Sequence, residues 1–140
     1  MLLQTPPFEL ELPLADGPLE RGWPAIERFL EAGGLAPRIQ FVAGLVFEET
    51  VTNILRHTAA GQCSVVRVVL EPDQETLRMA ILDDGPPFNP CAAQAEAPAG
   101  ASELSDGGRG ILLMRSMCRS MHYRRDHDWN RLEVLITAQP

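Results

Sequence analysis

The sequence predicts an α+β fold, a two-layer sandwich in which helices pack on one face of a mixed, mostly antiparallel sheet. Three observations support this prediction. A strand-like run opens the chain, two helix-like stretches follow it, and two hairpins occupy the second half with one helix between them. Hairpins produce antiparallel neighbours, and helices segregated from them along the chain cover one side of the sheet.

The length of 140 residues fits a single domain, residues 1–140, with one core. A formal net charge of −7 argues against nucleic acid as a direct partner, because phosphate backbones attract basic surfaces. All basic side chains are arginine, so a Walker-type lysine loop is excluded. The chain shows no signal peptide, no run long enough to cross a membrane, and three scattered cysteines. We therefore expect a cytoplasmic protein with reduced thiols and no membrane association.

The first half of the chain predicts one strand and two helices. Residues 8–12 alternate apolar and polar and stop at Pro13, which is typical of a short strand with one buried face. Apolar residues then recur at helical spacing over residues 19–30. Because Pro24 lies inside that pattern, we expect an irregular first turn or a helix that begins there. A longer helix is expected from about residue 38 to about residue 58.

The second half predicts two hairpins separated by a loop and a helix. In order, these elements are strands at 63–70 and 76–82, a loop at 89–106, a helix at 111–117, and strands at 121–125 and 131–137. The loop is rich in Ala, Ser, Gly and Pro, and such a long run inside a compact domain is typical of a mobile functional loop. A polar turn around Asp128, Trp129 and Asn130 is expected to join the last two strands.

Two polar side chains interrupt the apolar row of the long helix. With 3.6 residues per turn, Val42, Val46, Glu49, Asn53 and His57 fall along one stripe of a helix that is apolar on several faces. An unpaired carboxylate on a core-facing row would be costly. Either the row opens onto a cavity that holds a cation or a phosphate ligand, or Glu49 and Asn53 lie at an edge and contact water. Helical periodicity leaves both explanations open.

Two further segments are candidate binding sites. Asp83-Asp84-Gly85 follows a strand, where a carboxylate can accept the amino hydrogens of a purine and the glycine lets a ring approach the backbone. The same three residues also fit a simple turn. Gly107-Gly108-Arg109-Gly110 precedes an apolar helix, and the free N–H groups at a helix N-terminus attract phosphate. This cluster also fits a flexible hinge before a helix.

In their order and spacing, the three segments resemble the motifs of the GHKL or Bergerat-type ATP-binding domain, shared by gyrase, heat-shock chaperones, histidine kinases and MutL. Within that superfamily the chain is most similar to the small anti-sigma-factor serine/threonine kinases. Residues 47–57 (FEETVTNILRH) match the N box, residues 81–90 (ILDDGPPFNP) the first glycine box, and residues 107–115 (GGRGILLMR) the second. The resemblance covers nearly the whole chain.

The resemblance implies a role for each motif. Asn53 would coordinate the Mg²⁺ that bridges the ATP phosphates, and Glu49 would be the general base for a serine or threonine hydroxyl. Asp83 would bind the adenine amino group, with Gly85 giving the base room. The other residues expected at the nucleotide are Arg56, His57, Phe88, Gly107, Gly108, Arg109 and Gly110.

The resemblance also implies a flexible ATP lid at about residues 89–107. Gly108 and Gly110 would carry backbone amides to the phosphates, and Arg109 would add positive charge there. Two positions depart from the motifs of the wider superfamily.

Pro87 stands where the first glycine box usually has its second glycine, so the loop would be stiffer. Leu112 replaces a glycine of the second box, which leaves fewer flexible positions at the start of the helix. Both departures bear on the strength of ATP binding, and neither removes a residue expected to carry out chemistry.

The function implied by the resemblance is that of an anti-sigma regulatory factor that acts in transcription regulation. It would be a serine/threonine protein kinase that binds a sigma factor, phosphorylates an anti-anti-sigma (STAS-type) partner with ATP, and forms a homodimer. Two alternatives remain. One is a nucleotide-sensing or protein-binding partner-switch module without catalysis. The other is an ATP lobe related to histidine kinases, although the chain has no room for a phosphoacceptor domain.

Overall fold

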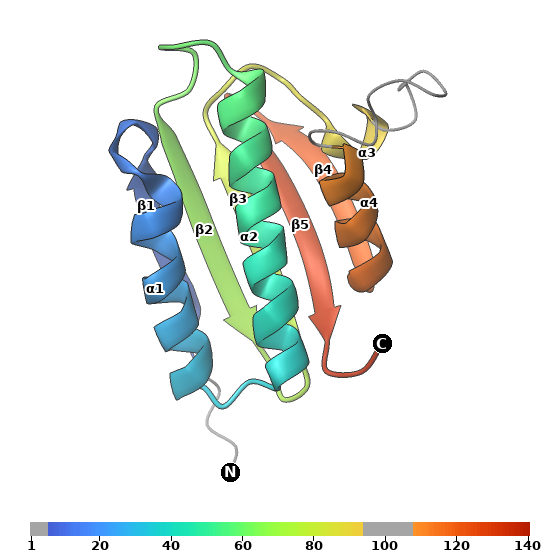
Figure 1. Ribbon diagram of the computed structural model, residues 1–140. Coiled ribbons are helices and arrows are strands. Elements are labelled where there is room, and N and C mark those ends of the chain that lie inside the picture. The colour runs from blue at the N-terminus through green and yellow to red at the C-terminus, as the bar shows by residue number, and fades with distance from the viewer. Residues whose placement is uncertain (1–5, 94–107) are drawn as a thin grey trace.

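The computed structural model describes residues 6–93 and 108–140 (Figure 1). The elements are β1 (Phe8–Pro13), α1 (Pro18–Ala32), α2 (Pro37–His57), β2 (Val65–Pro72), β3 (Thr76–Asp83), α3 (Pro90–Ala93), α4 (Gly108–Met117), β4 (Ser120–Asp126) and β5 (Trp129–Thr137). A single 3-10 turn at Leu14–Asp16 joins β1 to α1. The predicted α+β class is confirmed.

The strands form one sheet in the order β1-β2-β3-β5-β4. All four pairings are antiparallel, where a mixed, mostly antiparallel sheet was expected. The connections explain this difference. The chain runs through two antiparallel helices between β1 and β2, and through helix α4 and strand β4 between β3 and β5. In both cases the second strand therefore returns in the direction opposite to the first.

The helices pack on one face of the sheet, with α2 at the centre, α1 beside it towards β1, and α4 towards β4 (Figure 1). Alternate strand residues point towards this layer, and Leu10, Val68, Ile81 and Leu132 form one row across the sheet. The last three of these side chains are buried. Burial of apolar area between the two layers is the main stabilising contribution.

Two details refine the sequence prediction. The first helix begins at Pro18, which suits its first turn, and it continues through Pro24, which is exposed. Pro24 therefore costs one backbone hydrogen bond without ending the helix. Strand β5 begins at Trp129, because the hairpin turns tightly at His127, which adopts a φ of 56°. Asn130 therefore lies in a strand and not in the turn.

The loop expected at 89–106 contains the short helix α3 at its start. Residues 94–107, which include most of the predicted lid, lie outside the described part of the chain. Within residues 6–93 and 108–140, no helix combines the length and hydropathy that crossing a bilayer requires.

Candidate nucleotide-binding site

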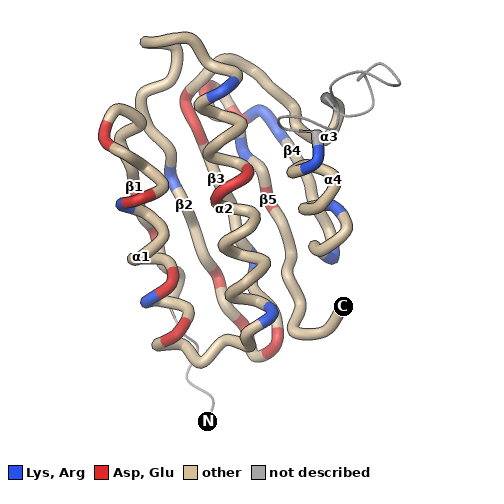
Figure 2. The backbone as a smooth tube through the Cα atoms, viewed as in Figure 1, with Lys and Arg blue, Asp and Glu red and all other residues tan. Residues whose placement is uncertain are grey.

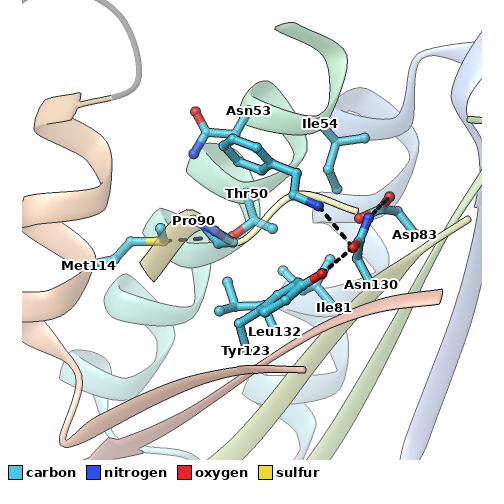
Figure 3. A pocket seen from close by; sticks show the side chains of 11 residues that line it. Thr50, Asn53, Ile54, Ile81, Asp83, Pro90, Met114, Tyr123, Asn130 and Leu132 are labelled. Carbon is cyan, nitrogen blue, oxygen red and sulfur yellow. Dashed lines mark hydrogen bonds between the residues drawn. The ribbon is translucent and has the colours of Figure 1, made fainter. Parts of the chain in front are cut away.

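A pocket opens where α2 and α4 meet the sheet beside α3 (Figure 3). Its walls combine apolar side chains with a few polar groups that converge from distant parts of the chain. The lining residues are Thr50, Asn53, Ile54, Ile81, Asp83, Phe88, Pro90, Met114, Tyr123, Asn130 and Leu132. A largely apolar lining with a few polar groups is common in small-molecule sites. The volume of this pocket is only about 20 Å³ in the described structure, so its walls would have to move apart to admit a nucleotide.

Asp83 is fixed in this pocket by its neighbours. Its side chain is buried at the end of β3, and Asn130 lies opposite it on β5. The Asp83 carboxylate oxygen Oδ1 accepts hydrogen bonds from Asn130 Nδ2 at 3.0 Å and from the Gly85 backbone N–H at 2.9 Å. Burial raises the pKa of Asp83 above its ordinary value, although these two hydrogen bonds act in the opposite direction. The carboxylate is therefore held in one orientation.

Asn130 also organises the loop that follows β3. Its Oδ1 accepts hydrogen bonds from the Tyr123 hydroxyl at 2.6 Å and the Phe88 backbone N–H at 3.2 Å (Figure 3). It also accepts one from Arg125 Nη1 at 3.3 Å. Its Nδ2 also donates to the Pro86 carbonyl at 2.9 Å. We call Asp83, Asn130, Tyr123 and Arg125 the polar cluster. Each polar atom of the Asn130 side chain is satisfied within it, so a buried amide is tolerated.

Gly85 is constrained by packing against the same carboxylate. A Cβ at this position would lie 2.9 Å from Asp83 Oδ1, 3.2 Å from Cys63 Cβ and 3.2 Å from Thr58 Cγ2. The Gly85 carbonyl also accepts a 2.7 Å hydrogen bond from Arg125 Nη1. Gly85 does not line the pocket. Its absent side chain lets the loop approach Asp83, and room for a base at this position stays a prediction.

Asp84 has a different environment from Asp83. Its carboxylate accepts hydrogen bonds from the Ser64 hydroxyl, from the Ser64 backbone N–H at 2.8 Å and from the Val65 backbone N–H at 3.1 Å. Partial burial acts to raise its pKa, but these hydrogen bonds outweigh it and lower the pKa to about 2. Asp84 therefore ties the end of β3 to the start of β2.

Cys63 lies beside both carboxylates, with its Sγ 3.2 Å from Asp84 Oδ1 and 3.9 Å from Asp83 Oδ1. Burial, followed by the hydrogen bond to Asp84 and the charges of both carboxylates, raises the pKa of the Cys63 thiol to about 12. A thiol that stays protonated at neutral pH is a poor nucleophile. This environment argues against a catalytic cysteine here.

Asn53 is the opposite case to Asn130. Its side chain is only 3% exposed and points into the pocket from α2 (Figure 3). Neither its Oδ1 nor its Nδ2 has a hydrogen-bond partner in the described structure. A buried amide without partners costs about 1–3 kcal/mol. An oxygen ligand for a cation and a donor to phosphate are therefore both available at this position.

Glu49 lies one turn before Asn53 on α2 and does not line the pocket. It is half-buried against α4, at the buried residue Gly110. A Cβ at Gly110 would lie 1.8 Å from Glu49 Oε2 and 2.5 Å from Glu49 Cδ. Any other residue at position 110 would displace this carboxylate. The N box and the second glycine box are therefore in direct contact.

The remaining motif residues are distributed around the pocket. The Phe88 ring lines it and stacks on the exposed His57 ring, with centroids 4.5 Å apart. Arg56 and Arg109 are exposed and do not line the pocket. Gly108 begins α4, whose N-terminal end also carries the buried Gly110. Gly107 lies outside the described residues, so its role stays a prediction.

Sequence reasoning missed the part of the polar cluster that comes from the last hairpin. Asn130 was assigned to a turn, and Tyr123 and Arg125 only to a strand. One signal was present, because Asn130 is in phase with Leu132 and Val134, which alternate along β5 and are buried. A polar residue in phase with core positions of a strand indicates a buried hydrogen-bonding role.

Comparison with known proteins identifies the family of this chain. Residues 23–136 match the histidine kinase-like ATPase domain, so the chain belongs to this family. The chain is 29% identical over 107 residues to the serine/threonine-protein kinase BtrW of Bordetella bronchiseptica, an alignment that covers 74% of each chain. It also aligns with the histidine kinase AdeS of Acinetobacter baumannii at 14% identity and a TM-score of 0.42, covering 99% of this chain and 70% of that one.

Proposed function

We propose that this chain is an ATP-dependent serine/threonine protein kinase. The observation that carries the proposal is the buried, unpartnered amide of Asn53, which faces the same pocket as the fixed carboxylate of Asp83. In a histidine kinase-like ATPase domain, these two groups suit the two ends of one nucleotide. The similarity to BtrW, named a serine/threonine-protein kinase, supports protein hydroxyl groups as the acceptors.

Asp83 would accept a hydrogen bond from the adenine amino group. Its Oδ1 already takes the bonds from Asn130 and Gly85, whereas its Oδ2 accepts none from a described residue. Asn53 Oδ1 would be one ligand of a Mg²⁺ ion, which prefers oxygen ligands and usually completes its shell with phosphate oxygens and water. The cation would neutralise charge on the phosphates during transfer.

In this proposal Glu49 would act as the general base. It would take the proton of the acceptor hydroxyl while the hydroxyl oxygen attacks the γ-phosphorus and ADP leaves. The start of α4 lies against Glu49 at Gly110, so phosphate held by the N-terminal amides of α4 would be close to the base. Arg109, which is exposed at that end, would add positive charge.

The partners belong to the same proposal. As a regulator of the anti-sigma type, the chain would form a homodimer, bind a sigma factor and phosphorylate an anti-anti-sigma partner of the STAS type.

Incubation of the chain with radiolabelled ATP, Mg²⁺ and a STAS-type partner tests the proposal. We expect phosphoserine or phosphothreonine on the partner, lost in Glu49→Gln while ATP binding is kept. Glu75→Gln, an exposed change in the turn between β2 and β3, is the matched control and should transfer phosphate normally. Absence of Mg-ATP binding at about 1 mM nucleotide would refute the proposal.

A non-catalytic partner-switch module is the second candidate. One observation favours it, because Glu49 presses against Gly110 and does not line the pocket. Normal Mg-ATP binding without transfer to any partner would select this candidate over the kinase.

A further inference from the structure

A groove of about 650 Å³ separates α1 from α2 on the outer side of the helix layer, distinct from the nucleotide pocket. Its walls are apolar and partly aromatic. The Trp23 ring lies against the backbone of α2, where a Cβ at Gly44 would be 3.0 Å from it. Phe41, on the same side of α2, is 64% exposed, and the half-buried Leu19 and Leu45 extend the apolar surface. An exposed aromatic side chain beside a groove is typical of an interaction surface.

The charged residues that line this groove are all acidic. They are Glu20 and Glu27 from α1 and Glu48 from α2, each of them exposed. None forms an ion pair within the described part of the chain. Figure 2 colours the acidic positions of both helices red and their basic positions blue. An apolar floor with an unpaired acidic rim complements a ligand that is apolar on one face and basic at its edges.

We propose that this groove is a docking site for a basic amphipathic helix of a partner protein. On each helix the lining residues span about eight positions, from Leu19 to Glu27 and from Gln40 to Glu48, which corresponds to about 12 Å or two helical turns. That length suits a helix whose apolar anchors recur at positions i, i+3, i+4 and i+7. The acidic rim disfavours anionic lipid and nucleic acid as occupants.

The groove and the nucleotide pocket lie on different sides of α2. Glu48 lines the groove, while its neighbour Glu49 faces Gly110 of α4. Consecutive residues of a helix point in directions about 100° apart, so one helix can serve both sites. A docked helix would therefore leave the pocket open, and the docking site is independent of whether the chain transfers phosphate.

The test uses Trp23 as a reporter in the full chain carrying Trp129→Phe, which removes the only other tryptophan. The probe is a synthetic helical peptide of about 14 residues with Leu on one face and Arg at both edges. Two control peptides carry Glu in place of Arg, or Ala in place of Leu. We expect a saturable change in Trp23 fluorescence with the Arg–Leu peptide and none with either control.

Two charge-matched triple variants locate the binding. The groove variant is Glu20→Gln/Glu27→Gln/Glu48→Gln, and the control is Glu31→Gln/Glu71→Gln/Glu75→Gln, whose three side chains are exposed elsewhere. Circular dichroism checks that both fold. We expect the groove variant to weaken binding by about tenfold and the control by less than about twofold.

Three outcomes would overturn the proposal. The first is no binding of the Arg–Leu peptide at about 1 mM, and the second is an equal loss of affinity in both triple variants, which would mean non-specific attraction to an acidic protein. The third concerns a second copy of the chain as the occupant. If the chain self-associates in sedimentation velocity and Phe41→Ser abolishes that association, this face is an interface between copies.

Discussion

The two ends of the pocket differ in how their buried amides are satisfied. At one end, Asn130 makes hydrogen bonds through both of its polar atoms within the polar cluster. At the other end, Asn53 is as deeply buried and has no partner in the described structure. The same chemical group therefore stabilises the fold in one place and costs stability in the other.

The difference shows which contacts the protein supplies by itself. The polar cluster fixes Asp83 and the backbone from Gly85 to Phe88 before any ligand arrives, which lowers the entropic cost of binding. Asn53 and Glu49 lack such a framework, and the contacts that would satisfy Asn53 are those of the proposed Mg²⁺ and phosphates. Natural sites often keep such unsatisfied groups at the expense of stability.

Removal of Asn130 should have the largest effect on stability. Asn130→Ala leaves Asp83 buried without its side-chain donor and leaves the Tyr123 hydroxyl without its acceptor. We expect a loss of about 3 kcal/mol in the free energy of unfolding, measured by urea titration. Tyr123→Phe, which removes one hydrogen bond of the same cluster, should lose about 1 kcal/mol. A loss in Asn130→Ala no larger than in Tyr123→Phe would show that the bonds of Asn130 to Asp83 and Pro86 add nothing to its bond with Tyr123.

Gly110→Ala tests the contact between the N box and the second glycine box. The new methyl group would lie 1.8 Å from Glu49 Oε2, so the carboxylate must move away from the start of α4. The atoms that must move are the end of a flexible side chain, so we expect little change in the free energy of unfolding, measured by urea titration. We expect loss of phosphotransfer to the partner, because the carboxylate is displaced. A fully active Gly110→Ala would disprove the placement of the base.

Asn53→Leu should stabilise the free protein while it removes function. Replacing an unpartnered buried amide by an apolar side chain of similar size should add about 1 kcal/mol to the free energy of unfolding. The same change removes the proposed cation ligand, so calorimetry should detect no Mg-ATP binding. Asn130→Leu is the matched control and should destabilise, because its amide is fully bonded. Destabilisation by Asn53→Leu would mean that this amide already has a partner.

Much of the fold could be predicted from local sequence patterns. The long helix was expected at residues 38–58 and lies at Pro37–His57, because its apolar periodicity and its proline at the start agree. The strand order could not be read in the same way, since it depends on how hairpins and helices stack across the sheet. The antiparallel pairing of β3 with β5, 47 positions apart at Asp83 and Asn130, has no local sequence signal.

The candidate site could be predicted only in part, because contacts between distant segments leave no local sequence signal. Glu49 and Asn53 could be found because one helix places both near a core-facing row. Whether each side chain has a hydrogen-bond partner could not be predicted, because any partner would come from another helix or strand. The contact of Glu49 with Gly110 and the bonds of Asp83 to Asn130 both join segments far apart in the chain. Sequence patterns identified the polar residues at core-facing positions. The packing of the folded chain determines which of them have hydrogen-bond partners.

The smallest predicted effect is an opposite pH dependence of the contributions that Asp83 and Asp84 make to the stability of the fold. Burial raises the pKa of Asp83 above 3.8, so the folded state holds that proton more tightly than the unfolded state does. Its contribution to stability is present at low pH and is lost as the pH rises through the raised folded pKa. Hydrogen bonds lower the pKa of Asp84 from 3.8 to about 2, so its contribution is present at higher pH and is lost as the pH falls from about 4 to about 2.

Urea unfolding of the wild type, Asp83→Asn and Asp84→Asn between about pH 3 and pH 6 measures these opposite slopes. The stability advantage of the wild type over Asp84→Asn should shrink as the pH falls, because the Asp84 carboxylate loses its charge. The advantage over Asp83→Asn should shrink as the pH rises, because the wild type must then ionise a buried carboxyl that the amide replaces. Slopes of the same sign for both variants would mean that Asp83 and Asp84 share one environment, against their different hydrogen-bond partners.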